Sequence, residues 1–125
     1  MLRIVLVFVL LVWGLGSLKA SSPVGKWKGS WSSGSTGHRG ALRARIRATE
    51  NGAFKAVFAG RFAVVVPFFY RTELFPVASR PGQYVSVKKL PLLGTYRMRA
   101  TVSGNDFHAT FSGGQDRGIF EMKRR

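Results

Sequence analysis

The feature that most constrains this chain is a short pattern that recurs along it, a turn-forming residue followed by alternating side chains. The pattern starts at Gly40, Gly52, Gly94 and Asn105, and apolar residues then occupy every second position. Alternation with period two is typical of a β-strand that buries one face and exposes the other. Turns between such strands favour an antiparallel meander, and closing the sheet into a barrel removes its edges.

Counting these runs predicts an all-β fold, a small up-and-down antiparallel β-barrel of about eight strands. Asn51-Gly52 is the strongest hairpin signal, because both residues tolerate the positive φ of a tight two-residue turn. The side chains expected inside are Trp27, Trp31, Leu42, Phe54, Phe58, Tyr96, Phe107, Phe111 and Phe120, alternating with Ala44, Ala56, Ala100 and Ala109. Large residues facing small ones favour a filled interior, and a hydrophobic pocket beneath Trp27 and Trp31 stays open as the alternative.

One stretch departs from the alternation. Residues 62–75 are largely apolar on both faces and contain Pro67. A proline inside a strand usually marks an edge, a bulge or a break. We therefore expect either one long bent strand or two short ones, turning a corner of the barrel.

The first 20 residues have the features of an export signal. Arg3 precedes an unbroken apolar run from Ile4 to Trp13, and Ala20 offers a cleavage site. The apolar stretch from Ile4 to Leu18 covers 15 residues, fewer than the ~20 that a membrane-spanning helix needs, so a retained anchor is the weaker alternative. We expect a signal peptide over residues 1–20, a linker over 21–25 and a single β-barrel domain over 26–125, exported to the periplasm or secreted.

The chain is strongly basic, with 20 Lys and Arg residues against five Asp and Glu and a formal net charge of +15. Removing Arg3 and Lys19 leaves 18 basic residues against the same five acids, a net charge of +13. The alternation predicts that many of these charges lie on the outer face of the barrel, namely Arg43, Arg45, Arg47, Lys55, Arg61, Arg97 and Arg99. Such a face fits an anionic envelope polymer or lipid, and it is equally typical of a solvated strand.

Several classes of chemistry find little support in the residues. The chain has no cysteine, only two histidines and five scattered acids, so it lacks disulfides, thiol catalysis and the clustered ligands of a metal site. The aromatic residues lie on the face opposite the basic ones, which argues against base stacking and sequence-specific nucleic-acid binding. We expect no enzyme and no cofactor, and a monomer; a hydrolase built on His38 and Asp116 is the weakest alternative.

Two sets of motifs carry a resemblance. Gly25-Lys26-Trp27-Lys28-Gly29-Ser30-Trp31 resembles the glycine-x-tryptophan opening of lipocalin and avidin (calycin) barrels, over this short stretch only. The segments GHRGALRARIRA, LPLLGTYRMRA and DRGIFEM are similar to a group of short exported bacterial proteins that have no assigned function. The second likeness spans most of residues 25–124 and implies a single exported domain, without catalytic residues.

Two functions therefore remain. The first is the binding of a small apolar or amphipathic ligand inside the barrel, for which the candidate residues are Trp27, Trp31, Phe58, Tyr96 and Phe111. The second is association with anionic polymers or lipids through the basic outer face defined above.

Overall fold

The computed structural model describes residues 22–62, 66–92, 94–114 and 116–125, and all regular structure in this part of the chain is β-strand. The expected signal peptide, residues 1–20, lies outside the described residues. Eight strands follow one another: β1 (Gly25–Ser33), β2 (Arg39–Ala48), β3 (Phe54–Phe62), β4 (Val66–Pro76), β5 (Gln83–Leu90), β6 (Gly94–Ser103), β7 (Asp106–Gly113) and β8 (Asp116–Arg124). The first strand thus begins at Gly25, the last residue of the expected linker.

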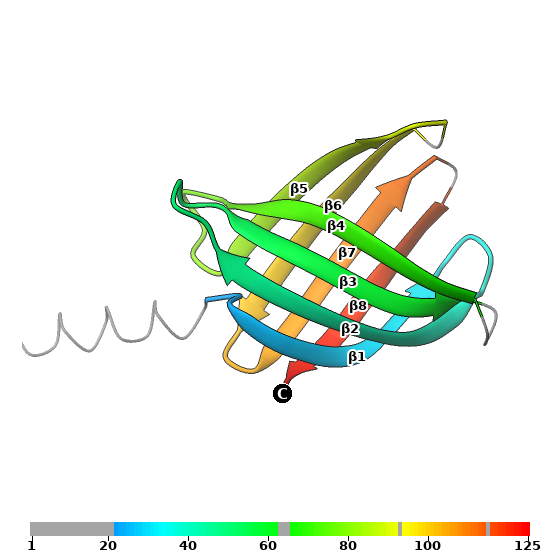
Figure 1. The fold of residues 1–125 in the computed structure, drawn as a ribbon, viewed down its shortest axis with the longest axis horizontal. Helices are drawn as coiled ribbons and strands as arrows, with labels where there is room; N and C mark the ends of the chain where they lie inside the picture. The colour runs from blue at the N-terminus through cyan, green and yellow to red at the C-terminus, as the bar shows by residue number, and fades with distance from the viewer. Residues whose placement is uncertain (1–21, 63–65, 93, 115) are drawn as a thin grey trace, which may run out of the picture.

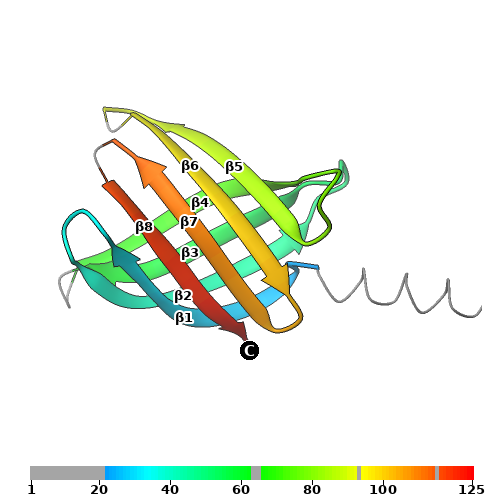
Figure 2. The same cartoon turned by 180° about the vertical axis from the view of Figure 1, so that it is seen from behind.

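The strands form a closed antiparallel barrel. Each strand pairs with the next, and β8 returns to pair with β1, which gives the order β1 to β8 around the barrel. In Figure 1, β1–β4 form a front layer that crosses a back layer of β5–β8, and Figure 2 shows the same arrangement from behind. The predicted all-β, up-and-down barrel of eight strands is confirmed.

The predicted Asn51-Gly52 turn joins β2 to β3. Gly52 has a φ of 84°, a left-handed conformation that costs glycine nothing because it has no Cβ. The Thr49 N–H donates to the Ala53 carbonyl at 2.9 Å and closes the hairpin. The turn therefore sets the register in which Ala48 faces Phe54.

The two faces of each strand separate as the alternation predicts. In β2, Leu42, Ala44 and Ile46 are buried, and the arginines between them are exposed. The largest fully buried side chains include Trp27, Phe58 and Phe107. Phe54, Tyr96 and Phe111, also expected inside, are half-buried. Burying a phenylalanine contributes about 1.5–3 kcal/mol, so this interior can hold the barrel without disulfides.

The structure resolves the alternatives for residues 62–75. Phe62 ends β3, and the rest of the stretch from Val66 belongs to β4, which pairs back onto β3 from Phe62↔Val66 to Phe54↔Leu74. The stretch therefore contributes one strand, β4, and not two short ones, and Pro67 lies near the start of that strand. The sequence placed the boundary between the two strands only approximately, because Ala63, Val64 and Val65 carry no glycine, proline or asparagine turn signal.

The contact between β4 and β5 is much shorter than the other strand pairings. Only Phe75↔Val85 and Pro76↔Tyr84 are in register, whereas β3 and β4 share a ladder along their whole length. Figures 1 and 2 both show the two strands meeting at one end and diverging toward the other. β4 is thus an edge over most of its length, which explains how it accommodates Pro67. We call the diverging part of this pair the β4–β5 gap.

Candidate functional site

The barrel is closed at the end where β1 begins. The Arg124 guanidinium, at the end of β8, lies over the Trp27 ring with its carbon 4.2 Å from the ring centroid. It also donates to the carbonyls of Ser22 at 2.8 Å and Gly104 at 3.1 Å. The Trp27 indole N–H donates to the carbonyl of Pro23, a fully buried residue, at 2.9 Å. These contacts hold the start of the described chain across this end of the barrel.

The middle of the barrel is filled by aromatic rings. Phe58 is fully buried, and its ring centroid lies 5.2 Å from that of Phe120 and 6.2 Å from that of Phe107. Separations of this size are favourable for aromatic pairs. Trp27 and Phe58, two of the residues predicted to bind ligand, are therefore placed in the packed core.

The opposite end of the barrel contains a cavity of about 430 Å³. This volume falls within the ~300–1,000 Å³ of typical small-molecule sites. Its apolar lining consists of Trp31, Phe68, Phe69, Tyr70, Leu90, Tyr96, Met98, Phe111 and Phe120, to which Arg97 and Asp116 add charge. Three predicted ligand residues, Trp31, Tyr96 and Phe111, come together here. The interior is thus filled in one half and hollow in the other.

Cross-strand glycines make room for the aromatic lining. Four aromatic residues each face a glycine of the neighbouring strand: Trp31↔Gly40, Phe68↔Gly60, Tyr96↔Gly113 and Phe111↔Gly118. A Cβ on Gly60 would lie 2.6 Å from the Phe68 ring, and one on Gly118 would lie 2.5 Å from the Phe111 ring. The rings therefore occupy space over the glycine backbone, against the barrel wall. This arrangement leaves the centre of the barrel open.

Three hydroxyl-bearing residues, Tyr70, Thr72 and Ser86, form a polar spot at the β4–β5 gap. Burial raises the pKa of Tyr70 above its ordinary value of 10.0, although the neighbouring Thr72 and Ser86 hydroxyls act in the opposite direction. Ser86 is only 1% exposed, and its Oγ makes no hydrogen bond of normal geometry within the described residues. Burial also raises the pKa of Tyr84, which precedes the gap on β5. Tyr70 is therefore a neutral hydroxyl at ordinary pH.

Several residues that line the cavity were not among those predicted to bind ligand. Phe68 and Tyr70 lie in the stretch whose apolar residues occupy both faces, so alternation gave no inward set there. Leu90 and Met98 do alternate correctly with their neighbours, and this period-two signal could have found them. The inward face of β4 follows from its register with β3, which the apolar pattern of this stretch does not contain.

The predicted basic residues are all exposed, but they lie on different parts of the barrel. On β2 and β3, the register places Arg45 beside Val57 and Arg47 beside Lys55, with Arg43 one row further along. Arg61 ends the same outer face of β3. Arg97 and Arg99 lie on β6, in the other layer of the barrel. The fold therefore separates the predicted basic residues into two groups, one on β2 and β3 and one on β6.

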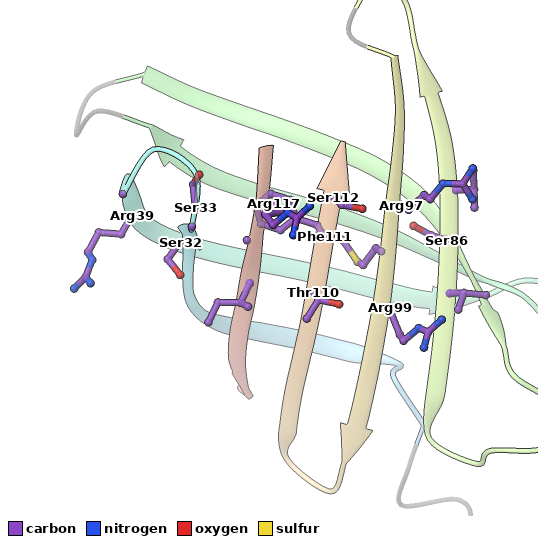
Figure 3. Close-up of a pocket in the computed structure, with 17 residues that line it drawn as sticks. Ser32, Ser33, Arg39, Ser86, Arg97, Arg99, Thr110, Phe111, Ser112 and Arg117 are labelled. Atoms are coloured by element: carbon purple, nitrogen blue, oxygen red, sulfur yellow. The ribbon is translucent and has the colours of Figure 1, made fainter. Parts of the chain in front are cut away.

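The β6 arginines belong to a second basic surface, an open groove of about 980 Å³ (Figure 3). Two rows of side chains cross it: Val87, Arg97, Ser112 and Arg117 in one, and Val85, Arg99, Thr110, Ile119, Ser32 and Arg39 in the next. None of the described residues that line the groove is acidic. Arg39 and Arg117 were not predicted, because they stand beside turns and join this surface only through pairing between strands. Four arginines and three hydroxyls suit the binding of oxyanions.

The remaining titratable residues show no clustering. Within the described residues, no three His, Cys, Asp or Glu side chains approach one another closely enough to hold a metal ion. Both His108 and Glu121 are exposed, and His108 Nε2 lies 3.8 Å from the Glu121 carboxylate. Asp116, half of the hydrolase alternative, accepts a hydrogen bond from the Ser33 hydroxyl. His38, the other half, is exposed in the loop between β1 and β2.

Comparison with protein-family models and with curated protein sequences finds no match. Among the described residues, no helix combines the length and apolar character needed to span a membrane. The class that the structure defines is therefore a small closed β-barrel with one sealed end and one open cavity.

Proposed function

We propose that this chain is a non-enzymatic, exported β-barrel protein that binds a small apolar or amphipathic molecule in the open half of the barrel. The observation that carries the proposal is the cavity of about 430 Å³ and its lining of aromatic and aliphatic side chains. Ligand sites are typically concave, mostly apolar and equipped with a few polar groups. The resemblance of the Gly-x-Trp opening to calycin barrels and the signal-like residues 1–20 support the same proposal.

The neutral fluorophore N-phenyl-1-naphthylamine tests this function. We expect the purified protein to bind it with an increase in fluorescence. Leu90→Trp should lower the affinity at least tenfold, because Leu90 lines the cavity and a larger ring would occupy its volume. Val87→Trp is the matched control, since Val87 lies on the same strand but is 59% exposed on the outside.

Two outcomes would contradict the proposal. One is the absence of binding by the folded wild-type protein. The other is equal loss of affinity in the two tryptophan variants, which would place the fluorophore on the outer surface.

The groove in Figure 3 favours a second function, the binding of anionic polymers or lipids of the cell envelope. Arg39, Arg97, Arg99 and Arg117 line it, and none of its described lining residues is acidic. Arginine guanidinium groups pair with phosphate and carboxylate through two parallel hydrogen bonds. Both functions are compatible in one molecule, because Arg39, Arg99 and Arg117 line the groove and not the cavity, although Arg97 is shared by the two.

A further inference from the structure

The β4–β5 gap leaves backbone groups without a neighbouring strand. Register pairs end at Phe75↔Val85, so the earlier part of β4 and the later part of β5 share no ladder. Backbone carbonyls removed from water need another hydrogen-bond donor. Lys88 of β5 supplies one, because its Nζ donates to the carbonyl of Arg71 on β4. A lysine side chain therefore bridges the two strands where the sheet does not.

Lys88 also lies next to two residues of the cavity lining, although it is itself part of the outer hollow at the gap. It alternates with the buried Tyr84 and Ser86 on the inner face of β5, whereas its neighbour Lys89 is exposed. Its Nζ is 5.5 Å from the centroid of the Tyr70 ring, and its cross-strand partner is Tyr96. Both tyrosines line the cavity. The ammonium thus sits beside the cavity's aromatic lining at the gap.

The positive charge of Lys88 has no acidic partner in the described part of the chain, where no carboxylate lies within 4.0 Å of its Nζ. Glu73 lines the same outer hollow as Lys88 and is opposite Lys55 in the register between β3 and β4, and Asp116 accepts a hydrogen bond from Ser33. An ammonium has three N–H donors, and the Arg71 carbonyl takes one. Lys88 therefore keeps the capacity to bind an anion.

A second polar group at the same place is the buried Ser86 hydroxyl. It interacts with the Tyr70 hydroxyl but makes no hydrogen bond of normal geometry among the described residues. A buried hydroxyl left unsatisfied is costly, so such groups normally find a protein, water or ligand partner. On the outside, Lys88 shares a hollow at the gap with Thr72, Glu73 and Val87. The ammonium and the hydroxyls therefore lie together at the gap, and the cavity lining adds Arg97 and Asp116 to its apolar side chains.

We propose that the ligand is an amphipathic anion, with its apolar body in the cavity and its carboxylate, sulfonate or phosphate head bound by Lys88 at the β4–β5 gap. This inference rests on the ligand-binding function proposed above and specifies its chemistry. The Ser86 and Tyr70 hydroxyls supply further donors to the head group, and Trp31, Phe68 and Phe111 contact the body. Lys88 is then the residue that distinguishes an anion from a neutral molecule of the same shape.

Two fluorophores with the same ring system separate the contribution of the apolar body from that of the charged head group. N-phenyl-1-naphthylamine is neutral, and 8-anilinonaphthalene-1-sulfonate carries a sulfonate on the same framework. We expect the wild-type protein to bind the sulfonate about tenfold more tightly, as one charge-assisted hydrogen bond provides. Lys88→Met should remove this preference and change the affinity for the neutral fluorophore less than twofold. Lys88→Gln, which keeps a donor for the Arg71 carbonyl, replaces it if the methionine variant fails to fold.

Lys89→Met is the matched control, because it removes the same charge from the adjacent, outward-facing position. It should leave both affinities nearly unchanged. An equal loss of sulfonate binding in the Lys88 and Lys89 variants would overturn the proposal, since general attraction to a basic surface would explain it. Equal binding of the two fluorophores by the wild type would overturn it as well, while the cavity function would stand. Failure of both to bind would instead reject that function.

The anion could come from a free amphiphile or from a lipid headgroup, and displacement of the bound sulfonate distinguishes them. Displacement by dodecanoate identifies a free carboxylate, and displacement only by phosphatidylglycerol vesicles identifies a lipid headgroup. Dodecanol is the neutral counterpart of dodecanoate. Displacement by dodecanol as effective as by dodecanoate would contradict a role for the charge.

Discussion

Glycine has a specific role in this barrel, because the absence of a Cβ leaves space in the barrel wall for an aromatic ring of the neighbouring strand. Gly113 illustrates it best: the three atoms nearest to an added Cβ all belong to the Tyr96 ring. At Gly40 and Gly118 the nearest atom is instead a backbone carbonyl, so a side chain there would disturb the sheet itself. Of the four glycines that face aromatic residues, Gly113 is the one whose added Cβ would have only atoms of a cavity-lining ring as its three nearest neighbours.

This difference makes Gly113→Ala a specific test. The added methyl group would overlap the Tyr96 ring and push it off the wall, toward the cavity. We expect the affinity for N-phenyl-1-naphthylamine to fall several-fold, and the unfolding free energy to fall by about 1–3 kcal/mol, as overpacking typically costs. Fluorescence titration and urea denaturation measure the two effects.

The double variant Gly113→Ala, Tyr96→Ala is the control, because removal of the ring restores the space. Its affinity should exceed that of the single variant. Wild-type affinity in the single variant would show that the Tyr96 ring does not border the binding volume.

Among the strands, β4 differs most from its neighbours. It pairs with β3 along nine register positions but with β5 at only two. Lys88 joins the two strands through a side chain to the Arg71 carbonyl instead of a backbone ladder. Strand edges without backbone partners open more easily than paired ones. The β4–β5 gap is therefore where the barrel is least stabilised by its own sheet.

Hydrogen exchange should reveal this asymmetry. We expect peptides covering residues 68–74 and 86–90 to contain a fast-exchanging fraction of amides, those that face the gap. Peptides from β1 and β8 should exchange slowly, because these strands are paired on both sides. Mass spectrometry of deuterium uptake measures the difference. Equally slow exchange in all eight strands would mean that the barrel is fully paired in solution.

On the scale of the whole molecule, the barrel is closed at one end and hollow at the other, and basic residues lie on the outer surface of both layers. Arg124 and Trp27 seal one end, and the cavity occupies the other. Basic residues cover both layers, with Arg45 on β2 in one and Arg99 on β6 in the other. Successive outward residues of a strand lie ~6.6–7 Å apart, comparable with the spacing of charges along an anionic polymer.

Association with anionic polymers should therefore be electrostatic and largely non-specific. We expect binding to polyphosphate and heparin to weaken steeply with salt, each phosphate contact adding ~0.7–0.9 to the logarithmic slope. Arg99→Glu and Arg45→Glu test the two layers separately, and neither should alter the fold, because both side chains are exposed. Fluorescence anisotropy over a salt series measures the affinities.

A larger effect of Arg99→Glu would assign the polymer to the groove of Figure 3, and a larger effect of Arg45→Glu to the outer face of β2 and β3. Salt-independent binding, or unchanged binding in both variants, would show that these arginines are solvated surface residues without a role in polymer binding.

The part of this structure that sequence could predict is the part that local chemistry controls. Alternation in 42–47 separates the buried Leu42, Ala44 and Ile46 from the exposed arginines, and Asn51-Gly52 places a hairpin where the chain reverses. Trp31, Tyr96 and Phe111 were predicted as ligand residues and do line the cavity. The boundary between β3 and β4 was placed only approximately, because residues 63–65 carry no turn signal.

The sequence by itself therefore determined the barrel, the approximate number of its strands and, outside residues 62–75, the face on which most side chains lie, since period two and turn residues act within a few positions. Only the tertiary structure decided which half of the interior is hollow. That outcome depends on contacts between different strands: Phe68 over Gly60, Arg124 over Trp27, and Lys88 reaching the Arg71 carbonyl. The register between strands brings these pairs together, and no local pattern encodes the space that remains between them.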